Sequence, residues 1–296
     1  MTRPKLSAAV GHPLVRDLDI VDLHVHAGPD LLRRRHSVLA AARHAQQMRA
    51  WIVVKSHLTS TCAAAWEARQ EGLPASGSIV LNPIAGGMTT TAIEQSIYAH
   101  GTDCAARIIA YLPTMRHAGA HSSESLRALH HPGFTRQRWS ITTILDDEAE
   151  RRRLREVLRV VRDHDLIVAT GHSSREETLQ LIDMAESLGV PRLVITHALH
   201  PMSGFSLADI AEVADHPAVW VEITALAVLL GRHPKALIGQ AASVNPRVLL
   251  SSDLGQPEQP CLPSGWALVA DWLDSATFNA LAAVNPSRLL FRDHYQ

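Results

Sequence analysis

The sequence predicts a single-domain (β/α)8 (TIM) barrel, an α/β fold in which eight parallel strands alternate with helices, and three observations support this fold class. Eight short runs are rich in β-branched and aliphatic residues, are too short for helices, and are bounded by Gly, Pro or polar clusters. Alanine-rich stretches with helical spacing lie between most of these runs. Successive runs start 26 to 32 residues apart with one exception, which is the size of one strand-plus-helix unit.

Each run is predicted to form one strand, in the order of the chain. The eight predicted strands are at residues 18–25, 50–56, 77–82, 107–113, 166–171, 192–197, 219–224 and 247–253. The clearest intervening helices are predicted at residues 37–50, 62–71, 92–100, 148–163 and 176–188. The exceptional step of 59 residues, between the fourth and fifth runs, predicts an inserted segment at about residues 114–146, over the barrel mouth. We expect one domain over residues 1–296, with the barrel at about 18–290, because no Pro/Gly/Ser linker divides the chain.

The composition is that of a folded protein with a small-molecule partner. Lys plus Arg number 28 and Asp plus Glu 29, a net charge of −1, so no basic field is available to bind nucleic acid or an anionic membrane. Hydrophobic residues make up 46% of the chain, and no apolar stretch reaches the roughly 20 residues of a membrane span. Three cysteines without CxxC spacing and the absence of a secretory h-region favour a cytoplasmic location. Formation of a homo-oligomer stays open.

Histidine is the unusual feature of the composition, with 18 His against three Lys. Histidine is a common metal ligand and proton carrier near neutral pH. In barrels of parallel strands, catalytic groups come from the carboxyl ends of the strands and the loops that follow. Metal-competent residues stand at five of the eight predicted strand ends, namely His24 and His26, His57, His172, His197 and His200, and Asp253.

The pair His24 and His26 points to one face of a strand, because side chains alternate, so the two imidazoles can share one divalent ion. Asp22 has the same parity and is expected to support a ligand imidazole from behind, the alternative being a hydrogen bond to the barrel floor. Several imidazoles and a carboxylate with an open coordination position describe a catalytic zinc-like site, where the metal activates water and polarises the scissile group. Zinc is the first choice, although iron, manganese, cobalt and nickel accept the same ligands.

These residues resemble the amidohydrolase superfamily of metal-dependent barrel hydrolases. Its pattern is HxH after the first strand, histidines after the fifth and sixth strands, and an aspartate after the eighth. The likeness runs from Asp22 to the closing NPSRLL segment at residues 285–290. It looks most similar to a poorly characterised branch with DLHVHAGPD, VVKSH, ATGHSS and SSDLGQP segments.

The resemblance implies a role for each matching residue. His24, His26 and His172 would bind the metal, and Asp253 would bind it and also take the proton from the attacking water. His197 would bind a second metal ion or polarise the substrate carbonyl. The resemblance therefore implies one or two divalent ions.

The fourth strand departs from the family pattern. Two-metal members often bridge their ions with a carboxylated lysine there, whereas this chain has Tyr111 and Thr114. Lys55 and His57, at i and i+2 on the second strand, should both face inward. Lys55 would bind a substrate carboxylate or replace the missing bridge between two metal ions. His57 would contact the substrate. The structural alternatives are a lysine that snorkels to water and a packed wall histidine. Glu222 on the seventh strand is a weaker candidate.

Further substrate-binding candidates are basic. Guanidinium and imidazole donors suit a substrate that carries a carboxylate, although solvated loop residues are an equal alternative for any one position. The candidates are His200, the residues Arg116, His117 and His121 after the fourth strand, and, after the first, the basic run at residues 33–35 with the adjacent His36.

The predicted function is hydrolysis of an amide, cyclic imide, lactone or ester bond in a small, anionic molecule by metal-activated water. Non-oxidative decarboxylation is an alternative, because single-metal relatives with the same ligands carry out that reaction. A second alternative is a phosphoesterase resembling the polymerase-and-histidinol-phosphatase barrels, which begin with DLHxH and place a histidine where His57 falls. A purely structural metal or an anion-binding module is the non-enzymatic alternative.

Overall fold

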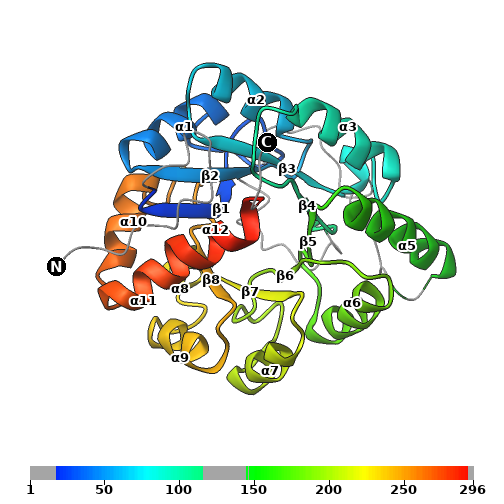
Figure 1. Ribbon diagram of the computed structural model, residues 1–296. Helices are drawn as coiled ribbons and strands as arrows, with labels where there is room; N and C mark the ends of the chain where they lie inside the picture. Colours follow the sequence, from blue (N-terminus) through cyan, green and yellow to red (C-terminus); the bar gives the residue numbers. More distant parts are fainter. Residues whose placement is uncertain (1–17, 116–144, 146, 293–296) are drawn as a thin grey trace.

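The computed structural model describes residues 18–115, 145 and 147–292, and these form the predicted (β/α)8 barrel. Eight parallel strands follow one another around the barrel in chain order, and a parallel bridge between Val25 and Leu254 brings the last strand back to the first (Figure 1). The strands are β1 Ile20–His26, β2 Ala50–Lys55, β3 Ala75–Val80, β4 Ile109–Tyr111, β5 Ile167–Ala169, β6 Leu193–Ile195, β7 Val219–Thr224 and β8 Val248–Ser251.

Helices surround the strands on the outside of the barrel (Figure 1). The five predicted helices are present, and the part of the chain that the structure describes contains additional short ones. The helices are α1 Val38–Gln47, α2 Cys62–Gln70, α3 Thr90–His100, α5 Glu148–Asp163, α6 Arg175–Ser187, α7 Leu207–Glu212, α8 Ala225–Leu229, α9 Ala236–Val244, α10 Leu262–Ala270, α11 Ser275–Asn279 and α12 Asn285–Leu290, with a π-helical turn at Ala280–Val284 and 3₁₀ turns at Pro83–Ala85 and Val213–Asp215. None of the described helices is long and apolar enough to cross a membrane.

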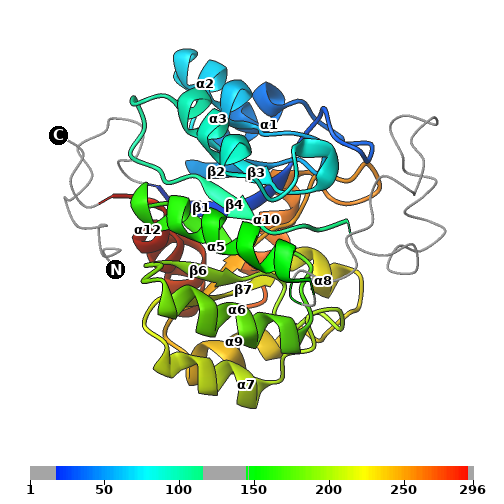
Figure 2. The same cartoon turned by 90° about the vertical axis from the view of Figure 1, so that its right-hand side faces the viewer.

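The hydrophobic core has two layers, and the inner one closes the amino-terminal end of the barrel. The outer layer lies between the strands and the helices. The inner layer includes Trp51 from β2, whose ring packs edge-on against Phe291 after α12 at 5.4 Å. Arg107 fastens this end, because it donates to the carbonyl oxygen of Leu289 and to the Asp165 carboxylate. Helix α12 and the short helix α8 lie at opposite ends of the barrel (Figure 2).

A β-bulge in β1 changes which side chains face the barrel interior. Asp22 pairs with Ile52, but the next pairing joins Val25 to Val54, so β1 has one extra residue there. Before the bulge the odd-numbered residues face inward, and after it His24 and His26 do.

Asp22 consequently faces outward, and the expectation that it shares a face with His24 and His26 is wrong. Its carboxylate accepts hydrogen bonds from Ser252 N at 3.0 Å and from Trp266 Nε1 at 2.9 Å, which ties β1 to the end of β8 and to α10. It also accepts from His24 N at 3.2 Å, so it supports that histidine through the main chain and not through the ring.

The predicted insertion at residues 114–146 lies almost wholly outside the described residues. Arg116, His117 and His121 fall within that part of the chain, so their predicted contacts with substrate stay predictions.

Candidate active site

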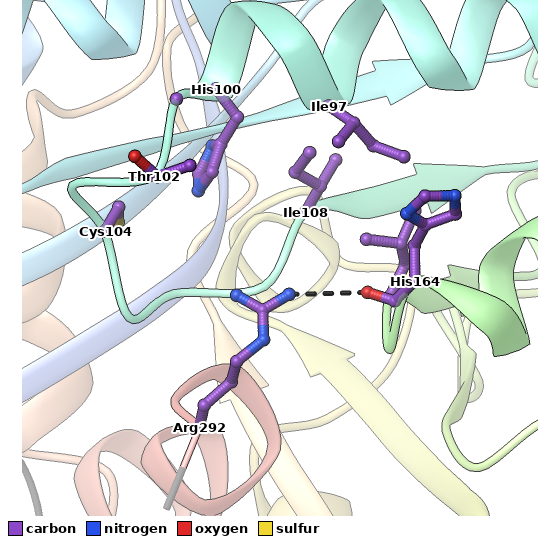
Figure 3. Close-up of a pocket in the computed structure, with 9 residues that line it drawn as sticks. Ile97, His100, Thr102, Cys104, Ile108, His164 and Arg292 are labelled. Carbon is purple, nitrogen blue, oxygen red and sulfur yellow. Dashed lines mark hydrogen bonds between the residues drawn. The ribbon is translucent and has the colours of Figure 1, made fainter. Parts of the chain in front are cut away.

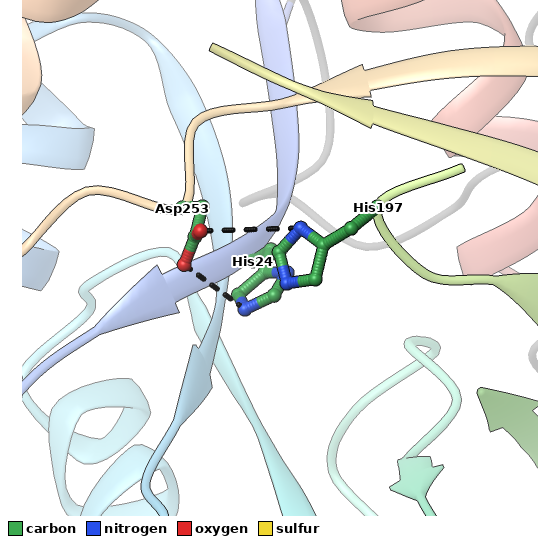
Figure 4. Close-up of side chains that lie close together, drawn as sticks. All are labelled: His24, His197 and Asp253. Atoms are coloured by element: carbon green, nitrogen blue, oxygen red, sulfur yellow. Dashed lines mark ion pairs between the residues drawn. The ribbon is translucent and has the colours of Figure 1, made fainter. Parts of the chain in front are cut away.

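The site is built around the carboxylate of Asp253, in the loop that follows β8 at the carboxyl end of the barrel. Asp253 Oδ1 lies 3.0 Å from His26 Nε2 and 3.3 Å from His24 Nε2, both on β1. Asp253 Oδ2 lies 3.9 Å from Nδ1 of His197, which follows β6 (Figure 4). Donor atoms of His24, His197 and Asp253 all lie within 4.8 Å of one another. Residues that are more than 200 positions apart in sequence therefore meet at one rim.

His197 and Asp253 have strained main-chain conformations that help to orient their side chains toward the site. His197 and Asp253 adopt φ angles of 54° and 56°, in the left-handed region that residues other than glycine rarely occupy. Hydrogen bonds hold both segments, from Asp253 N to His24 O at 2.8 Å and from Ala198 N to Glu222 O at 3.0 Å. Such strained conformations persist where the surrounding structure fixes them, and they are typical of functional sites.

Glu222 orients the ring of His24. Its two carboxylate oxygens lie 3.2 and 3.3 Å from His24 Nδ1, so the imidazole donates its N–H to the carboxylate and presents the lone pair of Nε2 to Asp253. Thr224 Oγ1, two residues along β7, lies 3.2 Å from His197 Nδ1. Glu222 thus has the ring-supporting position that we expected for Asp22.

Lys55 is buried in the same site and does not snorkel to water. Its side chain points inward from β2, and Nζ donates to His24 Nε2 at 2.9 Å. Nζ also lies 4.2 Å from the centre of the Tyr111 ring, whose hydroxyl donates to Leu23 O. Burial lowers the pKa of Lys55, while the carboxylates of Asp253 and Glu222 raise it.

The protonation states suit metal binding. Burial lowers the pKa of His24, His26 and His197 well below the usual value, so their rings are neutral and keep a lone pair for coordination. Burial raises the pKa of Asp253, and the nearby Glu222 carboxylate raises it further, whereas Lys55 lowers it. A carboxyl group whose pKa lies nearer neutrality is suited to accept and return a proton.

A second group of potential ligands, formed by His26, Asp30 and His57, lies beside the first. The His57 ring stacks on His26 with centroids 4.9 Å apart, and its Nδ1 lies 2.7 Å from Thr114 Oγ1. However, Asp30 Oδ2 already accepts from Arg34 Nε at 2.6 Å, so a buried guanidinium balances its charge. The first group is therefore the better candidate for a divalent ion.

The other predicted site residues line the rim. The His172 ring is half-buried, 5.7 Å from His197 and 6.2 Å from His57 between ring centres, but it belongs to neither potential ligand group. The His200 ring lies 6.2 Å from His197, and its Nδ1 accepts from Met202 N.

The sequence does not identify Asp30 as a residue of the site, indicates Arg34 only as part of a basic run, and makes Glu222 a weak candidate. Asp30 follows the HxH motif by four residues, and this spacing is the signal that could have identified it. Arg34 is one of three consecutive arginines, and nothing in the sequence separates it from its neighbours. Glu222 has the inward parity of β7, which could have raised its rank.

The amino-terminal end of the barrel has a separate cavity of about 330 Å³ (Figure 3). It is lined by Ile97, His100, Gly101, Thr102, Cys104, Ile108, His164, Leu166 and Arg292. Its residues precede β4 and β5 or follow α12, whereas the candidate site lies at the carboxyl ends of the strands. The cavity is therefore distinct from the histidine cluster.

The sequence and the fold both match known proteins. Residues 19–222 match the model of DUF6282, a family of unknown function. No curated protein matches the sequence.

Among solved structures, similar barrels share the fold at low sequence identity. An uncharacterised TIM-barrel protein from Bordetella bronchiseptica, Bb4693, has a TM-score of 0.57 and 12% identity, covering 92% of this chain and 98% of that one. The TatD homologue YjjV from Escherichia coli K12 has a TM-score of 0.54 and 18% identity, with the same coverage. A protein described as an amidohydrolase has a TM-score of 0.52 and 11% identity, covering 93% of this chain and 76% of that one. The predicted resemblance to amidohydrolase-type barrels is thus confirmed for the fold.

Proposed function

We propose that this chain, which belongs to the DUF6282 family, is a metal-dependent hydrolase that cleaves an amide, cyclic imide, lactone or ester bond in a small, anionic molecule. The observation that carries the proposal is the position of Asp253, whose carboxylate contacts two imidazoles and lies near a third at the carboxyl end of the barrel. Catalytic groups of barrel enzymes lie at this end.

The residues present fit a divalent cation. His24, His26 and His197 offer imidazole nitrogens that burial keeps neutral, and Asp253 offers carboxylate oxygens beside them. Imidazole nitrogens with a carboxylate oxygen form the ligand set of catalytic zinc sites. His24, His26, His197 and Asp253 would hold the ion, with zinc as the first choice. An ion on His24 Nε2 would replace the hydrogen bond that Lys55 now makes.

The bound cation would supply a water of lowered pKa and polarise the scissile group. Asp253 would accept the proton from the attacking water and pass it to the leaving group, because it lies among the proposed ligands and burial raises its pKa. Lys55 lies beside it and would donate a hydrogen bond to the oxyanion as it forms. Glu222 would hold His24 in the tautomer that this arrangement needs.

Removal of metal tests the proposal directly. Protein purified without an affinity tag should contain about one tightly bound divalent ion per chain, the number that the first ligand group would hold. Chelation should abolish hydrolysis of a panel of carboxylate-bearing amides, imides, lactones and esters, while the circular dichroism spectrum keeps its helical signal.

His24→Ala should have the same effect as chelation, because it removes a proposed ligand from the centre of the site. The matched control is His216→Ala, which removes a surface histidine that pairs with Glu186. The control variant should bind metal and turn over substrate like the wild type. Full activity after complete metal removal would contradict the proposal.

Non-oxidative decarboxylation is a second candidate. The buried Lys55 ammonium, 2.9 Å from His24 Nε2, favours it, because a cation there could bind the carboxylate that is lost. Release of carbon dioxide without consumption of water would identify this reaction. A three-metal phosphoesterase is less favoured, since Arg34 already balances the charge of Asp30 in the second ligand group.

A further inference from the structure

We propose that Arg34 binds a carboxylate of the substrate through the terminal nitrogens of its guanidinium group, and that this contact selects carboxylate-bearing substrates. The inference rests on the proposed function, because it names the substrate class of the same site. Its evidence is the placement of one arginine in the loop that joins β1 to α1.

Arg34 differs from its two neighbours in the basic run. The side chain of Arg33 is exposed, and Arg35 donates to the carbonyl oxygen of Gln259 at 2.7 Å and to that of Pro257. The side chain of Arg34 is only 2% exposed. Arg34 is thus the buried arginine of a run whose three residues are identical in sequence.

The guanidinium group of Arg34 is fixed at one nitrogen and unsatisfied at another. Its Nε donates to Asp30 Oδ2 at 2.6 Å, and the other oxygen of Asp30 accepts from Leu31 N and His57 N at 2.7 and 2.6 Å. Within the described part of the chain, buried Arg34 Nη2 has no hydrogen-bond partner. A buried N–H without an acceptor is costly, and a ligand oxygen placed there would remove that cost.

Carboxylate is the ligand whose geometry fits this group best. The planar guanidinium presents parallel N–H groups that match the two oxygens of a carboxylate, and the paired charges strengthen both hydrogen bonds. Nε donates to Asp30, and Nη2, which has no partner among the described residues, would donate to the anion.

The position of Arg34 connects this contact to the reaction site. Asp30 Oδ2, which anchors it, lies 3.8 Å from His26 Nδ1, and the other nitrogen of the His26 ring lies 3.0 Å from Asp253. Asp30 and the His26 ring thus form a chain of contacts from Arg34 to Asp253. This favours substrates in which a short spacer joins the carboxylate to the scissile bond.

Succinate and its neutral counterpart succinamide test the proposal by calorimetric titration of metal-loaded and of chelator-treated protein. Wild-type protein should bind succinate more tightly than succinamide in both preparations. Arg34→Met should weaken succinate binding at least about tenfold, the effect of losing charged hydrogen bonds, and leave succinamide binding unchanged. The matched control Arg33→Met, on the same loop but exposed, should bind succinate like the wild type.

Arg34→Lys guards against misfolding, because it keeps a cation beside Asp30 but loses the planar fork. It should keep the wild-type circular dichroism spectrum and bind succinate more weakly than the wild type. Unchanged succinate affinity in both Arg34 variants, or no succinate binding by wild-type protein, would overturn the inference.

The two preparations separate this inference from the proposed function. Succinate binding that depends on the metal but not on Arg34 would overturn the inference and leave the hydrolase proposal intact. Binding that depends on Arg34 in a protein without hydrolytic activity would support the anion site and remove the hydrolase assignment.

Discussion

Glu222 illustrates how much a buried residue without direct contact to substrate can determine at this site. Its carboxylate is buried on β7 and holds His24 Nδ1 through both oxygens. Carboxylates that orient a ligand histidine fix its tautomer and raise its affinity for metal.

Glu222→Gln should therefore weaken metal binding about 10- to 100-fold, the usual effect of losing such a partner. The amide keeps the shape of the side chain but removes its charge. Affinity is measured by competition with a chromophoric chelator, with Glu212→Gln on the exposed surface of α7 as the control. Equal metal affinity in Glu222→Gln and wild type would show that the carboxylate is structural only.

At the residue scale, the sequence predicts the side chains that strand ends present, but it does not single out those that loops bring in. His24, His26, His197 and Asp253 follow hydrophobic strands, so alternation and barrel topology predict that they meet. Arg34 and Asp30 occupy the site because their loop folds back over His57, a contact that depends on tertiary packing.

At the element scale, close packing between strands and helices leaves little room at one glycine. A Cβ atom at Gly77 on β3 would lie 2.4 Å from the Cα atom of Cys62 at the start of α2. Gly239 on α9 has no neighbouring atom within 4 Å of the same position. The two glycines thus provide a matched pair for one substitution.

Gly77→Ala should lower the free energy of unfolding by about 1–3 kcal/mol, because backbone must move apart. Gly239→Ala should raise the free energy of unfolding by about 1 kcal/mol, because alanine favours a helix interior. Urea denaturation followed by circular dichroism measures both changes. Stabilisation by Gly77→Ala would mean that α2 does not pack on β3 as closely as described.

The strands of this barrel were predictable because they are buried on both faces and therefore have continuous hydrophobic sequences. The bulge at Asp22 was not, because it depends on how β1 meets β2 and the segment after β8 when the barrel closes. The alternation of side chains along one strand does not depend on barrel closure, so it predicts the wrong face for Asp22.

At the scale of the whole molecule, stability should depend on pH through His100, a buried residue far from the candidate site. Burial and, to a smaller extent, the charge of Arg69 lower the pKa of His100 from 6.5 to about 4, although the hydrogen bond to Ala106 O opposes the shift. The folded protein thus binds the proton less readily than the unfolded chain.

The stability contributed by neutral His100 should be fully present above pH 6.5 and be lost as the pH falls toward 4. Between pH 7 and pH 5, wild-type protein should lose about 2 kcal/mol more than His100→Gln in free energy of unfolding. His164→Gln, an exposed residue of the same cavity, is the control and should follow the wild type. Parallel pH profiles for His100→Gln and wild type would contradict the prediction.

One end of the barrel carries stabilising contacts and the other carries the candidate site, and this separation affects which substitutions the protein can accept. Arg107 and Asp165 hold α12 at one end, while the candidate ligands lie on β1 and in the loops after β6 and β8 at the other. Substitutions in those loops leave the contacts of Arg107 unchanged, so we expect them to alter specificity more than stability. Laboratory evolution of this scaffold should accordingly confine its randomised codons to the loop after β1 and to the rim around His172 and His200.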